Sequence, residues 1–352
     1  MSEFIRRVMS GEDRSVKGVA LRLATSMIEP GYAIVMRGRN AMYDWGMLRK
    51  KGLGRPVISV GNITTGGTGK TPMVRWLAER LGESGVAVLL RGYKGARDGK
   101  SDEEMLLAEG LGDKAIVEAG SSRADSGARV LAAKPGVKAF ILDDGFQHRQ
   151  VARDFDLVLV NAADPFGYER VLPRGMLREP LAGLKRADAV VVTRSDQVSR
   201  NVLEKIEERI RRCNPDVAIY HARHALVGLV SSRQGRRDLQ ELQTTRFFAF
   251  AGIGNPESFG EQLQELGDEN FVGRHWFADH HDYSQRDLDD VVEEARQKNA
   301  GFLVTTEKDW VKISRLEAPA EMGIYRVEME MRFAEGDEER LLGQILQAIG
   351  SG

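Results

Sequence analysis

Short runs of aliphatic residues alternate with helical patterns through the first two hundred residues of the chain. Five such runs occur at residues 56–60, 86–90, 139–144, 156–160 and 187–192, and they read PVISV, VAVLL, AFILDD, DLVLV and ADAVVV. They do not alternate with polar residues, which is typical of parallel strands that are buried on both faces. The pattern predicts an α/β protein with a doubly wound, mostly parallel sheet.

A second α/β series begins after residue 245. It starts with RFFAFAGIG, continues through a helix at 257–266, FVGRHWF and a helix at 285–298, and reaches GFLVTT. A charged helix at 201–212 and an extended, polar stretch separate the two series. We therefore expect a larger domain over residues 41–216, a linker over 217–244 and a smaller α/β domain over 245–352. Closure of this linker would exclude water from a site shared by the two domains.

Residues 1–40 mix apolar and basic side chains. Between Val16 and Met36 the apolar residues are interspersed with Lys17 and Arg22, and the pair Pro30 and Gly31 interrupts the helical pattern. We expect two short amphipathic helices here. These helices either pack on the larger domain or place an apolar face in a membrane interface.

Composition and charge restrict the class of protein. The 352 residues are 42% hydrophobic and 29% charged, which allows a well-formed core. The formal net charge is −1, but residues 1–55 carry eleven Lys or Arg against five Asp or Glu. A basic leading segment on a near-neutral chain favours an anionic membrane surface as partner over nucleic acid. Cys213 is the single cysteine, which excludes an intramolecular disulfide and fits a reducing cytoplasm. No apolar stretch is long enough to span a bilayer.

The sequence GNITTGGTGKTP at residues 61–72 lies between an aliphatic run and the helical pattern MVRWLAERL. A strand, a glycine-rich loop and a helix in this order predict a P-loop. Lys70 would contact the terminal phosphates of a nucleoside triphosphate, and Thr71 would ligate Mg²⁺. The rest of the predicted nucleotide-binding loop, whose backbone N–H groups would surround the phosphates, consists of Thr64, Thr65, Gly66, Gly67, Thr68 and Gly69.

Thr64 departs from the standard pattern G-x-x-x-x-G-K-[ST], which has glycine at this position. A β-branched residue tolerates a positive φ poorly, so we expect the chain to enter the loop differently, with Gly61 making the turn. The alternative is a structural glycine-rich turn that binds no nucleotide. The sequence GGTGKT between a strand and a helix favours the P-loop.

The run AFILDDGFQH is an aliphatic strand that ends in Asp143 and Asp144. A strand that ends in two aspartates can simply begin a turn. After a P-loop, however, it predicts a Walker-B-like element whose carboxylates lie beside the Mg²⁺ ion. Gln147 and His148 follow at the carboxyl edge of the sheet, where ligands bind in such folds.

Several arginines are candidates for the same cleft. Arg123 precedes a helix in SSRAD, and LPRGMLREP places Arg174, Arg178 and Glu179 on a loop bounded by proline and glycine. Arginine in such a place could neutralise a phosphoryl group during transfer. The alternative for each one is a solvated surface group.

An acidic pair, Asp102 and Glu103, falls at a junction between loop and helix after the second aliphatic run. With Ser101, Asp102 could simply cap the helix. It could also accept the proton of an acceptor hydroxyl, as the catalytic aspartate of kinases does.

The sequence HWFADHHDY gathers His275, His280 and His281 around Asp279 and Asp282. The smaller domain has no complementary cluster of metal ligands, so a histidine oriented by a carboxylate is favoured over a metal site. A plain surface loop remains the alternative.

Two other functions fit parts of the sequence. Thr193, Arg194, Ser195 and Asp196 follow ADAVVV where a guanine-reading [NT]-K-x-D would lie, which suggests a GTPase-type switch. Arginine replaces the lysine, however, and DDGF offers no D-x-x-G switch. A nonenzymatic, nucleotide-dependent membrane adaptor is the other alternative, and the acidic pair at the end of AFILDD disfavours it.

Together these motifs resemble the tetraacyldisaccharide 4′-kinase family, the lipid A 4′-kinases of Gram-negative bacteria. The resemblance runs from about residue 30 to 330. It rests on VGNITTGGTGKTP, RGY, SSRAD, DDGFQHRQVARD, LPRGMLREP, FAGIGNP, FADHH and TTEKDWVK, which occur in this order. The family's own phosphate loop looks like the one here, with threonine at position 64.

The resemblance implies transfer of the ATP γ-phosphate to the 4′-hydroxyl of a membrane-embedded tetraacyl glucosamine disaccharide 1-phosphate. It places the enzyme peripherally at the cytoplasmic face of the inner membrane, with no obligate protein partner. Asp102 would act with His280 to activate the acceptor hydroxyl, and Glu103 is the alternative base. Further roles implied by the family are ATP and Mg²⁺ binding by Lys70 and Thr71, metal binding by Asp143 and Asp144, and lining of the site by Arg123, Gln147, His148, Arg178 and Glu179.

Overall fold

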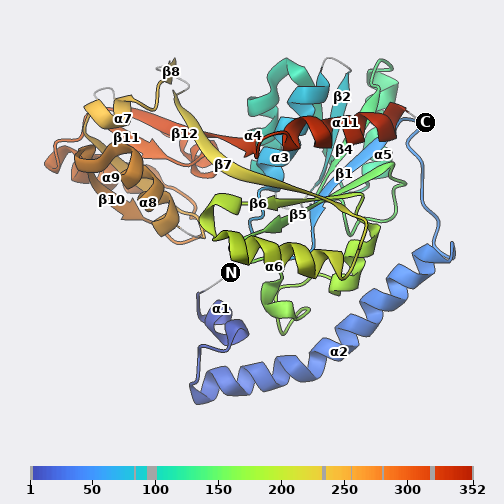
Figure 1. Cartoon of the computed structure of the whole chain (residues 1–352). Coiled ribbons are helices and arrows are strands. Elements are labelled where there is room, and N and C mark those ends of the chain that lie inside the picture. Colours follow the sequence, from blue (N-terminus) through green and yellow to red (C-terminus); the bar gives the residue numbers. More distant parts are fainter. Residues whose placement is uncertain are drawn as a thin grey trace. The chain divides into compact units, whose positions relative to one another are not determined.

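The computed structural model describes residues 3–82, 85–92, 101–231, 235–254, 256–279, 281–317 and 322–350 (Figure 1). The chain divides into two compact units. The first consists of Ser2–His224 together with Met331–Gly352, and we call it the P-loop unit. The second, Ala225–Glu330, we call the smaller unit.

The P-loop unit contains a parallel sheet in the order β7-β6-β5-β1-β4-β2-β3. This sheet confirms the predicted fold class. β3 lies at the edge, is only half-buried and has no counterpart among the predicted strands. The strands are β1 (Val57–Asn62), β2 (Val86–Arg91), β3 (Ala115–Gly120), β4 (Ala139–Asp143), β5 (Phe155–Asn161), β6 (Ala189–Thr193) and β7 (Ala218–Ser231).

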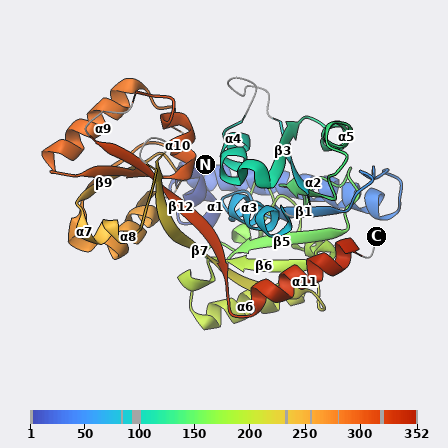
Figure 2. The ribbon, with the colours of Figure 1, turned by 90° about the horizontal axis from the view of Figure 1, so that it is seen from above.

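Helices cover both faces of this sheet. Successive residues of each strand point to opposite faces and therefore pack against different helices. In β5, Leu157 and Leu159 pack in the core that includes residues of α3, α4 and α11, whereas Val158 and Val160 pack with residues of α6. Figure 1 shows α3 and α11 on one side of the strands and α6 on the other, and Figure 2 gives the view from above. The helices are α3 (Lys70–Leu81), α4 (Asp102–Leu111), α5 (Arg123–Ala133), α6 (Arg200–Arg211) and α11 (Asp337–Gly350).

Two helices precede the sheet, α1 (Glu3–Ser10) and α2 (Val16–Asp44). The prediction that Pro30 interrupts the helical pattern is wrong, because α2 runs through Pro30 without a break. A proline removes one hydrogen bond to the carbonyl four residues earlier, here that of Ser26. Both Ser26 and Pro30 are exposed, so water can solvate that carbonyl.

The smaller unit is also built on parallel strands, in the order β10-β9-β11-β12. Its strands are β9 (Phe247–Ala251), β10 (Phe271–Trp276), β11 (Phe302–Thr305) and β12 (Gly323–Phe333), and β8 (Gly235–Arg237) pairs with β7 in antiparallel fashion. Its helices are α7 (Glu241–Thr244), α8 (Pro256–Gly267), α9 (Gln285–Gln297) and α10 (Glu307–Ile313). The short 3-10 helices of the whole chain are η3 (Gly112–Lys114), η4 (Gly167–Glu169), η5 (Leu181–Arg186), η6 (Ser195–Gln197) and η7 (Asp268–Asn270).

The units differ from the predicted domain boundaries at both ends of the smaller unit. The stretch predicted as a linker, 217–244, is occupied by β7, β8 and α7 in its described residues. The last residues, Met331–Gly352, group with the P-loop unit, since Leu341 and Ile345 of α11 are fully buried in its core. The chain therefore leaves the P-loop unit within β7 and returns to it within β12.

Candidate phosphate-binding site

The predicted phosphate loop joins β1 to α3. Gly66 has a φ of 140° and Gly69 a φ of 86°, conformations that residues with a side chain rarely adopt. Gly69 is the residue before the first turn of α3, and no side chain caps the helix there. The N–H groups of a first helical turn have no partner within the helix. Without a cap they are available to an anion, and the helix dipole favours its negative charge.

Gly61 has a different role from the predicted one. It lies within β1 and is not among the residues with positive φ, so it does not make the turn into the loop. Instead, a Cβ at this position would lie 2.6 Å from Cβ of Phe146 and 2.7 Å from its backbone nitrogen. Glycine is required here because the segment after β4 passes directly against the end of β1.

Thr64 is explained by a short ladder between the start of the loop and the segment 176–178. Thr64 forms an antiparallel bridge with Leu177. On either side of it, the Thr65 N–H donates to the Met176 carbonyl at 2.7 Å, and the Arg178 N–H donates to the Ile63 carbonyl at 2.8 Å. Extended backbone suits a β-branched residue, which explains why threonine replaces the standard glycine. The ladder also brings LPRGMLREP against the phosphate loop.

Two cations converge on one carboxylate beside this loop. The Lys70 ammonium lies 3.4 Å from Asp144 Oδ1 and 3.3 Å from Oδ1 of Asn62. Arg178 donates to both carboxylate oxygens of Asp144 at 2.7 Å. Burial alone would raise the pKa of Asp144, but Lys70 and Arg178 outweigh it and hold the pKa below its ordinary value. The cluster carries an excess positive charge, which suits a polyphosphate ligand.

Asp143 and Asp144 differ in their surroundings although they are adjacent. Asp143 ends β4 and is buried at 5% exposure, opposite Val60 of β1. Asp144 has a φ of 50° and keeps about a third of its side chain exposed, 32%. A left-handed conformation at a non-glycine residue is uncommon and is often found at functional sites. Arg123 is also buried and donates to the Asp143 carbonyl oxygen.

Gln147 and Glu179 form a polar network at the same edge of the sheet. Nε2 of Gln147 donates to the Asn62 carbonyl at 2.9 Å and to Oε1 of Glu179 at 2.9 Å. His148 follows, half-buried, and burial followed by the charge of Arg123 lowers its pKa to about 4. His148 is therefore a neutral imidazole at neutral pH.

The structure brings together part of the predicted site. Lys70, Asp144, Arg178, Gln147 and Glu179 are linked by the contacts above. Asp102 begins α4, where the Ser101 hydroxyl accepts from the Glu104 N–H at 3.2 Å, but the side chains of Asp102 and Glu103 are outside the described residues. His280 also lies outside them.

Arg174 and the two described histidines of the cluster face other partners. Arg174 donates to the Met9 carbonyl at 2.7 Å. His275 lies 2.9 Å from Glu294, and His281 lies 3.2 Å from Asp287, each carboxylate belonging to α9. Among the described residues, no group of three or more His, Cys, Asp or Glu side chains could hold a metal ion. The contacts of His275 with Glu294 and of His281 with Asp287 are those of histidines beside carboxylates.

Asn62 is a site residue that the sequence analysis did not single out, and Thr193 was considered there only as part of a possible guanine-reading motif. Asn62 contacts Lys70 with its side chain and Gln147 with its carbonyl, and it is fully buried. The Thr193 hydroxyl donates to the carbonyl of Thr68 in the phosphate loop at 2.9 Å. A polar residue at the last position of a buried strand is the signal that could have identified both.

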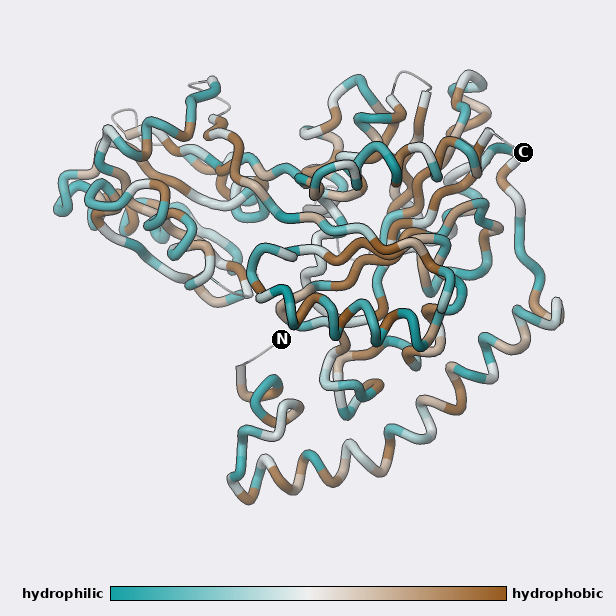
Figure 3. The backbone as a smooth tube through the Cα atoms, in the orientation of Figure 1, coloured by the Kyte–Doolittle hydropathy of each residue, from teal (hydrophilic) through white to brown (hydrophobic). Residues whose placement is uncertain are grey.

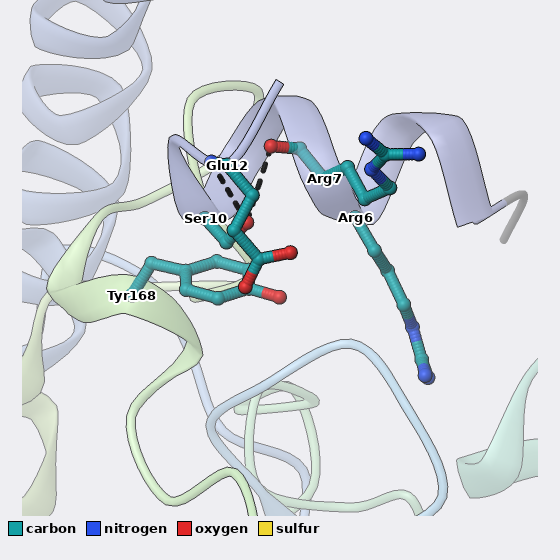
Figure 4. Close-up of a pocket in the computed structure, with 5 residues that line it drawn as sticks. All are labelled: Arg6, Arg7, Ser10, Glu12 and Tyr168. Carbon is teal, nitrogen blue, oxygen red and sulfur yellow. Dashed lines mark hydrogen bonds between the residues drawn. The ribbon is translucent and has the colours of Figure 1, made fainter. Parts of the chain in front are cut away.

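A pocket of about 590 Å³ lies away from the phosphate loop, next to α1. It is lined by Arg6, Arg7, Ser10, Glu12 and Tyr168. Figure 4 shows the Tyr168 ring beside the Glu12 carboxylate and the two guanidinium groups pointing in different directions. Its lining is polar and includes two cations.

Comparison with known proteins gives one consistent result. The family model described as tetraacyldisaccharide-1-P 4′-kinase matches residues 22–349. A tetraacyldisaccharide 4′-kinase of Halothermothrix orenii is 36% identical over 343 residues, covering 89% of this chain and 88% of that protein. One from an Anaeromyxobacter species is 36% identical over 364 residues, covering 98% and 96%. The crystal structure of LpxK from Aquifex aeolicus in complex with ATP is similar with a TM-score of 0.74 and 28% identity, covering 94% of this chain and 99% of that one.

Proposed function

The chain belongs to the tetraacyldisaccharide 4′-kinase family, and from this premise we propose that it transfers the γ-phosphate of ATP to the 4′-hydroxyl of a tetraacyl glucosamine disaccharide 1-phosphate. This reaction is a step of lipid A, and hence lipopolysaccharide, biosynthesis. The observation that carries the proposal is the convergence of Lys70 and Arg178 on Asp144 beside an uncapped helix. Phosphoryl transfer depends on positioned cations more than on covalent catalysis. The GTPase switch and the adaptor are disfavoured because the matched family is a kinase family.

Mg²⁺ fits the residues at this site. Thr71 lies in the first turn of α3, and the two carboxylates lie at and just after the end of the neighbouring strand β4. Mg²⁺ keeps several waters and substrate phosphate oxygens, and therefore needs only one or two protein carboxylates. Thr71, Asp143 and Asp144 would hold the ion, which would neutralise charge on the phosphate oxygens when bound.

Lys70 and Arg178 act on the phosphates in this proposal. When ATP occupies the loop, its oxygens compete with the Asp144 carboxylate for both cations. Lys70 then lies against the terminal phosphates, and Arg178 stabilises the negative charge on the phosphoryl group in flight. The ladder at Thr64 and Leu177 fixes the backbone of Arg178 relative to the loop, so the guanidinium is positioned before the substrate binds.

The acceptor hydroxyl needs a base, and the family resemblance assigns this role to Asp102 with His280. Glu103 is the alternative carboxylate. The position of Asp102 at the start of α4, in the loop-to-helix segment that follows β2, supports this role. Arg123, Gln147, His148 and Glu179 would line the site around the reacting groups.

We propose that the N-terminal helices bring the enzyme to the membrane that holds its lipid substrate. Within the described residues, none of the helices combines the length and apolarity that a bilayer crossing requires. α2 nevertheless exposes a row of large apolar side chains, and Figure 3 shows apolar positions recurring along its length. The most exposed of them are Val16, Leu23, Met27, Ile28, Ile34 and Val35. An amphipathic helix with basic residues lies in the interface of an anionic bilayer.

The polar pocket beside α1 fits the same role. Arg6 and Arg7 supply cations there, and Phe4 of α1 is exposed. In the proposed arrangement the enzyme is peripheral to the cytoplasmic face of the inner membrane, and it takes no nucleic acid and no obligate protein partner.

Removal of residues 1–35 tests the membrane proposal. The truncated protein should sediment less with vesicles that contain anionic phospholipid, and its apparent KM should rise for lipid more than for ATP. Unchanged sedimentation would overturn the assignment of these helices.

A lipid kinase assay with labelled ATP tests the activity and the roles together. Wild-type protein should label a tetraacyl disaccharide 1-phosphate at the 4′ position, and GTP should be a poor donor. Asp102→Ala and His280→Ala should each lower kcat, and comparison with Glu103→Ala identifies the base. Transfer that survives in Lys70→Ala would refute the proposed mechanism, and the absence of transfer by wild-type protein would refute the proposed activity.

A further inference from the structure

The two sides of α2 have different surroundings. Val16, Leu23, Met27 and Ile34 follow one another at spacings of seven, four and seven, which places them on one face of the helix. All four are exposed, Met27 at 82%. Tyr32 lies two positions before Ile34, and therefore roughly 200° around the helix from it at about 100° per residue.

The side of α2 that carries Tyr32 contacts the predicted catalytic segments. The Tyr32 hydroxyl donates to the Arg178 carbonyl at 2.8 Å. Two turns later, Arg39 donates to the Gln147 carbonyl at 2.7 Å, and Nδ2 of Asn40 donates to Oε2 of Glu179 at 2.8 Å. One helix thus holds the backbone at Arg178 and Gln147 and the side chain of Glu179.

Glu179 is the centre of this contact. Its side chain is 1% exposed, so its carboxylate depends on donors from the protein. Oε1 accepts from Gln147 at 2.9 Å and from Arg186 at 2.9 Å. Oε2 accepts from Asn40. Arg186 is itself fixed over the ring of Phe146, at 4.4 Å from its centroid.

The network continues from Glu179 to the phosphate loop. Gln147 uses the same Nε2 to reach the Asn62 carbonyl, and the Asn62 side chain lies 3.3 Å from the Lys70 ammonium. Glu179 is also the neighbour of Arg178 in sequence. A rotation of the Glu179 carboxylate would therefore disturb Gln147 directly and both cations of the site indirectly.

We propose that Asn40 is a positioning residue, which orients the buried Glu179 carboxylate and through it Gln147, Asn62 and the cations Lys70 and Arg178. The helix that faces the lipid surface would then set the geometry of phosphoryl transfer. This inference rests on the proposed kinase function. Asn40 touches no substrate in this scheme, and it acts through Glu179.

Two variants of Asn40 test the inference on the full-length protein. Asn40→Ala removes one hydrogen bond to a charged group, and kcat should fall about tenfold with little change in KM for ATP or lipid. Asn40→Asp places a second carboxylate against Glu179. Because the two carboxylates would have to share a proton, kcat relative to wild type should be lowest at pH 8 and recover towards pH 6.

Asn214→Ala is the matched control. Nδ2 of Asn214 donates to the carbonyls of Leu184 and Ala187 at 3.1 and 3.0 Å, so this change removes two hydrogen bonds between the turn that follows α6 and the segment 184–187. It should lower the unfolding midpoint and leave kcat per folded molecule unchanged. The altered pH profile of Asn40→Asp is a signature that a general loss of stability would not produce.

The outcomes separate this inference from the function on which it rests. Wild-type protein that transfers no phosphate to the lipid refutes the proposed function. Wild-type transfer, together with Asn40→Ala at wild-type kcat or with Asn40→Asp that follows the wild-type pH profile, refutes the positioning role. Loss of kcat in Asn40→Ala with recovery of Asn40→Asp at lower pH supports it.

Discussion

β1 of the P-loop unit and β9 of the smaller unit are both fully buried strands that end in glycine-containing loops before a helix. The two loops differ in what their backbone N–H groups contact. After β9, the Gly252 N–H donates to the carboxylate of Asp309 at 3.1 Å, and Asp309 is buried at 2% exposure. After β1, no side chain caps the start of α3, and Lys70 and Arg178 lie beside the loop. In the smaller unit a carboxylate accepts from the backbone of the loop, whereas in the P-loop unit the nearby Asp144 carboxylate contacts Lys70 and Arg178 and no side chain caps the first turn of α3.

The largest expected effect is on the phosphate loop, where no side chain caps the start of α3. Lys70→Ala should lower kcat/KM for phosphoryl transfer by about 10³-fold, because it removes a charge that stabilises the transition state. The measurement is initial rate with labelled ATP. Lys114→Ala is the matched control, since Lys114 forms an exposed ion pair with Glu79 in the same unit, and its rate should stay within twofold of wild type.

Substitution of one glycine in each loop sharpens the comparison. In Gly69→Ala the new Cβ would collide with Nε2 of His224 and force an alanine to a φ of 86°. We expect the Kd for ATP to rise about a hundredfold, from strain and displacement of the loop. Gly252→Ala is also crowded, with its Cβ 3.0 Å from Cβ of His281, but it should lower stability and spare ATP binding. Equal loss of ATP affinity in both variants would contradict the distinction between the loops.

Removal of the Asp309 carboxylate tests the comparison from the side of the smaller unit. Asp309→Ala takes away the acceptor of the Gly252 N–H and of the Thr306 hydroxyl, the latter at 2.7 Å. Leaving buried donors unsatisfied should destabilise the smaller unit by about 3 kcal/mol. Urea unfolding followed by tryptophan fluorescence, with Trp276 and Trp310 as probes, measures it. ATP affinity should be unchanged, and a large change would show that the two loops are not independent.

The smallest expected effect concerns pH. The pKa of His148 is lowered to about 4, below the ordinary value of 6.5, so the unfolded chain binds a proton more readily than the folded one between these values. Stability from this group is complete above pH 6.5 and decreases as pH falls towards 4. At pH 5 the loss relative to pH 7 should be about 1–2 kcal/mol. In His148→Asn this loss between pH 7 and pH 5 should be absent. If the free energy of unfolding depended on pH in the same way in both proteins, the assigned pKa would be contradicted.

The sequence was sufficient for the features that depend on local pattern. Uninterrupted aliphatic runs identified β1, β2, β4, β5 and β6, because strands buried on both faces need them. β3 was not predicted, because it is only half-buried and has no such aliphatic run. Pro30 misled the prediction, because α2 continues through this proline, and the carbonyl of Ser26 that loses its hydrogen bond belongs to an exposed residue.

The site was predictable where a motif specifies chemistry, and less so where distant segments meet. The motifs named Lys70, Asp144 and Arg178 as candidates, but the contact of Arg178 with Asp144 beside Lys70 depends on the ladder between Thr64 and Leu177. Residues 113 positions apart pair there, and no local pattern encodes such a contact. Asn40 was missed because its partner Glu179 is equally remote in the sequence and a single asparagine on a helix carries no signal.

The points at which the chain leaves and re-enters the P-loop unit are close together. The Ala334 N–H donates to the His221 carbonyl at 2.9 Å, so the residues that flank the smaller unit in the sequence are neighbours. A segment whose two ends nearly meet can be inserted into an existing protein without disturbing the core around it. Residues 225–330 therefore leave and rejoin the P-loop unit at neighbouring points, so a change in the length of this segment need not disturb the fold around the phosphate loop.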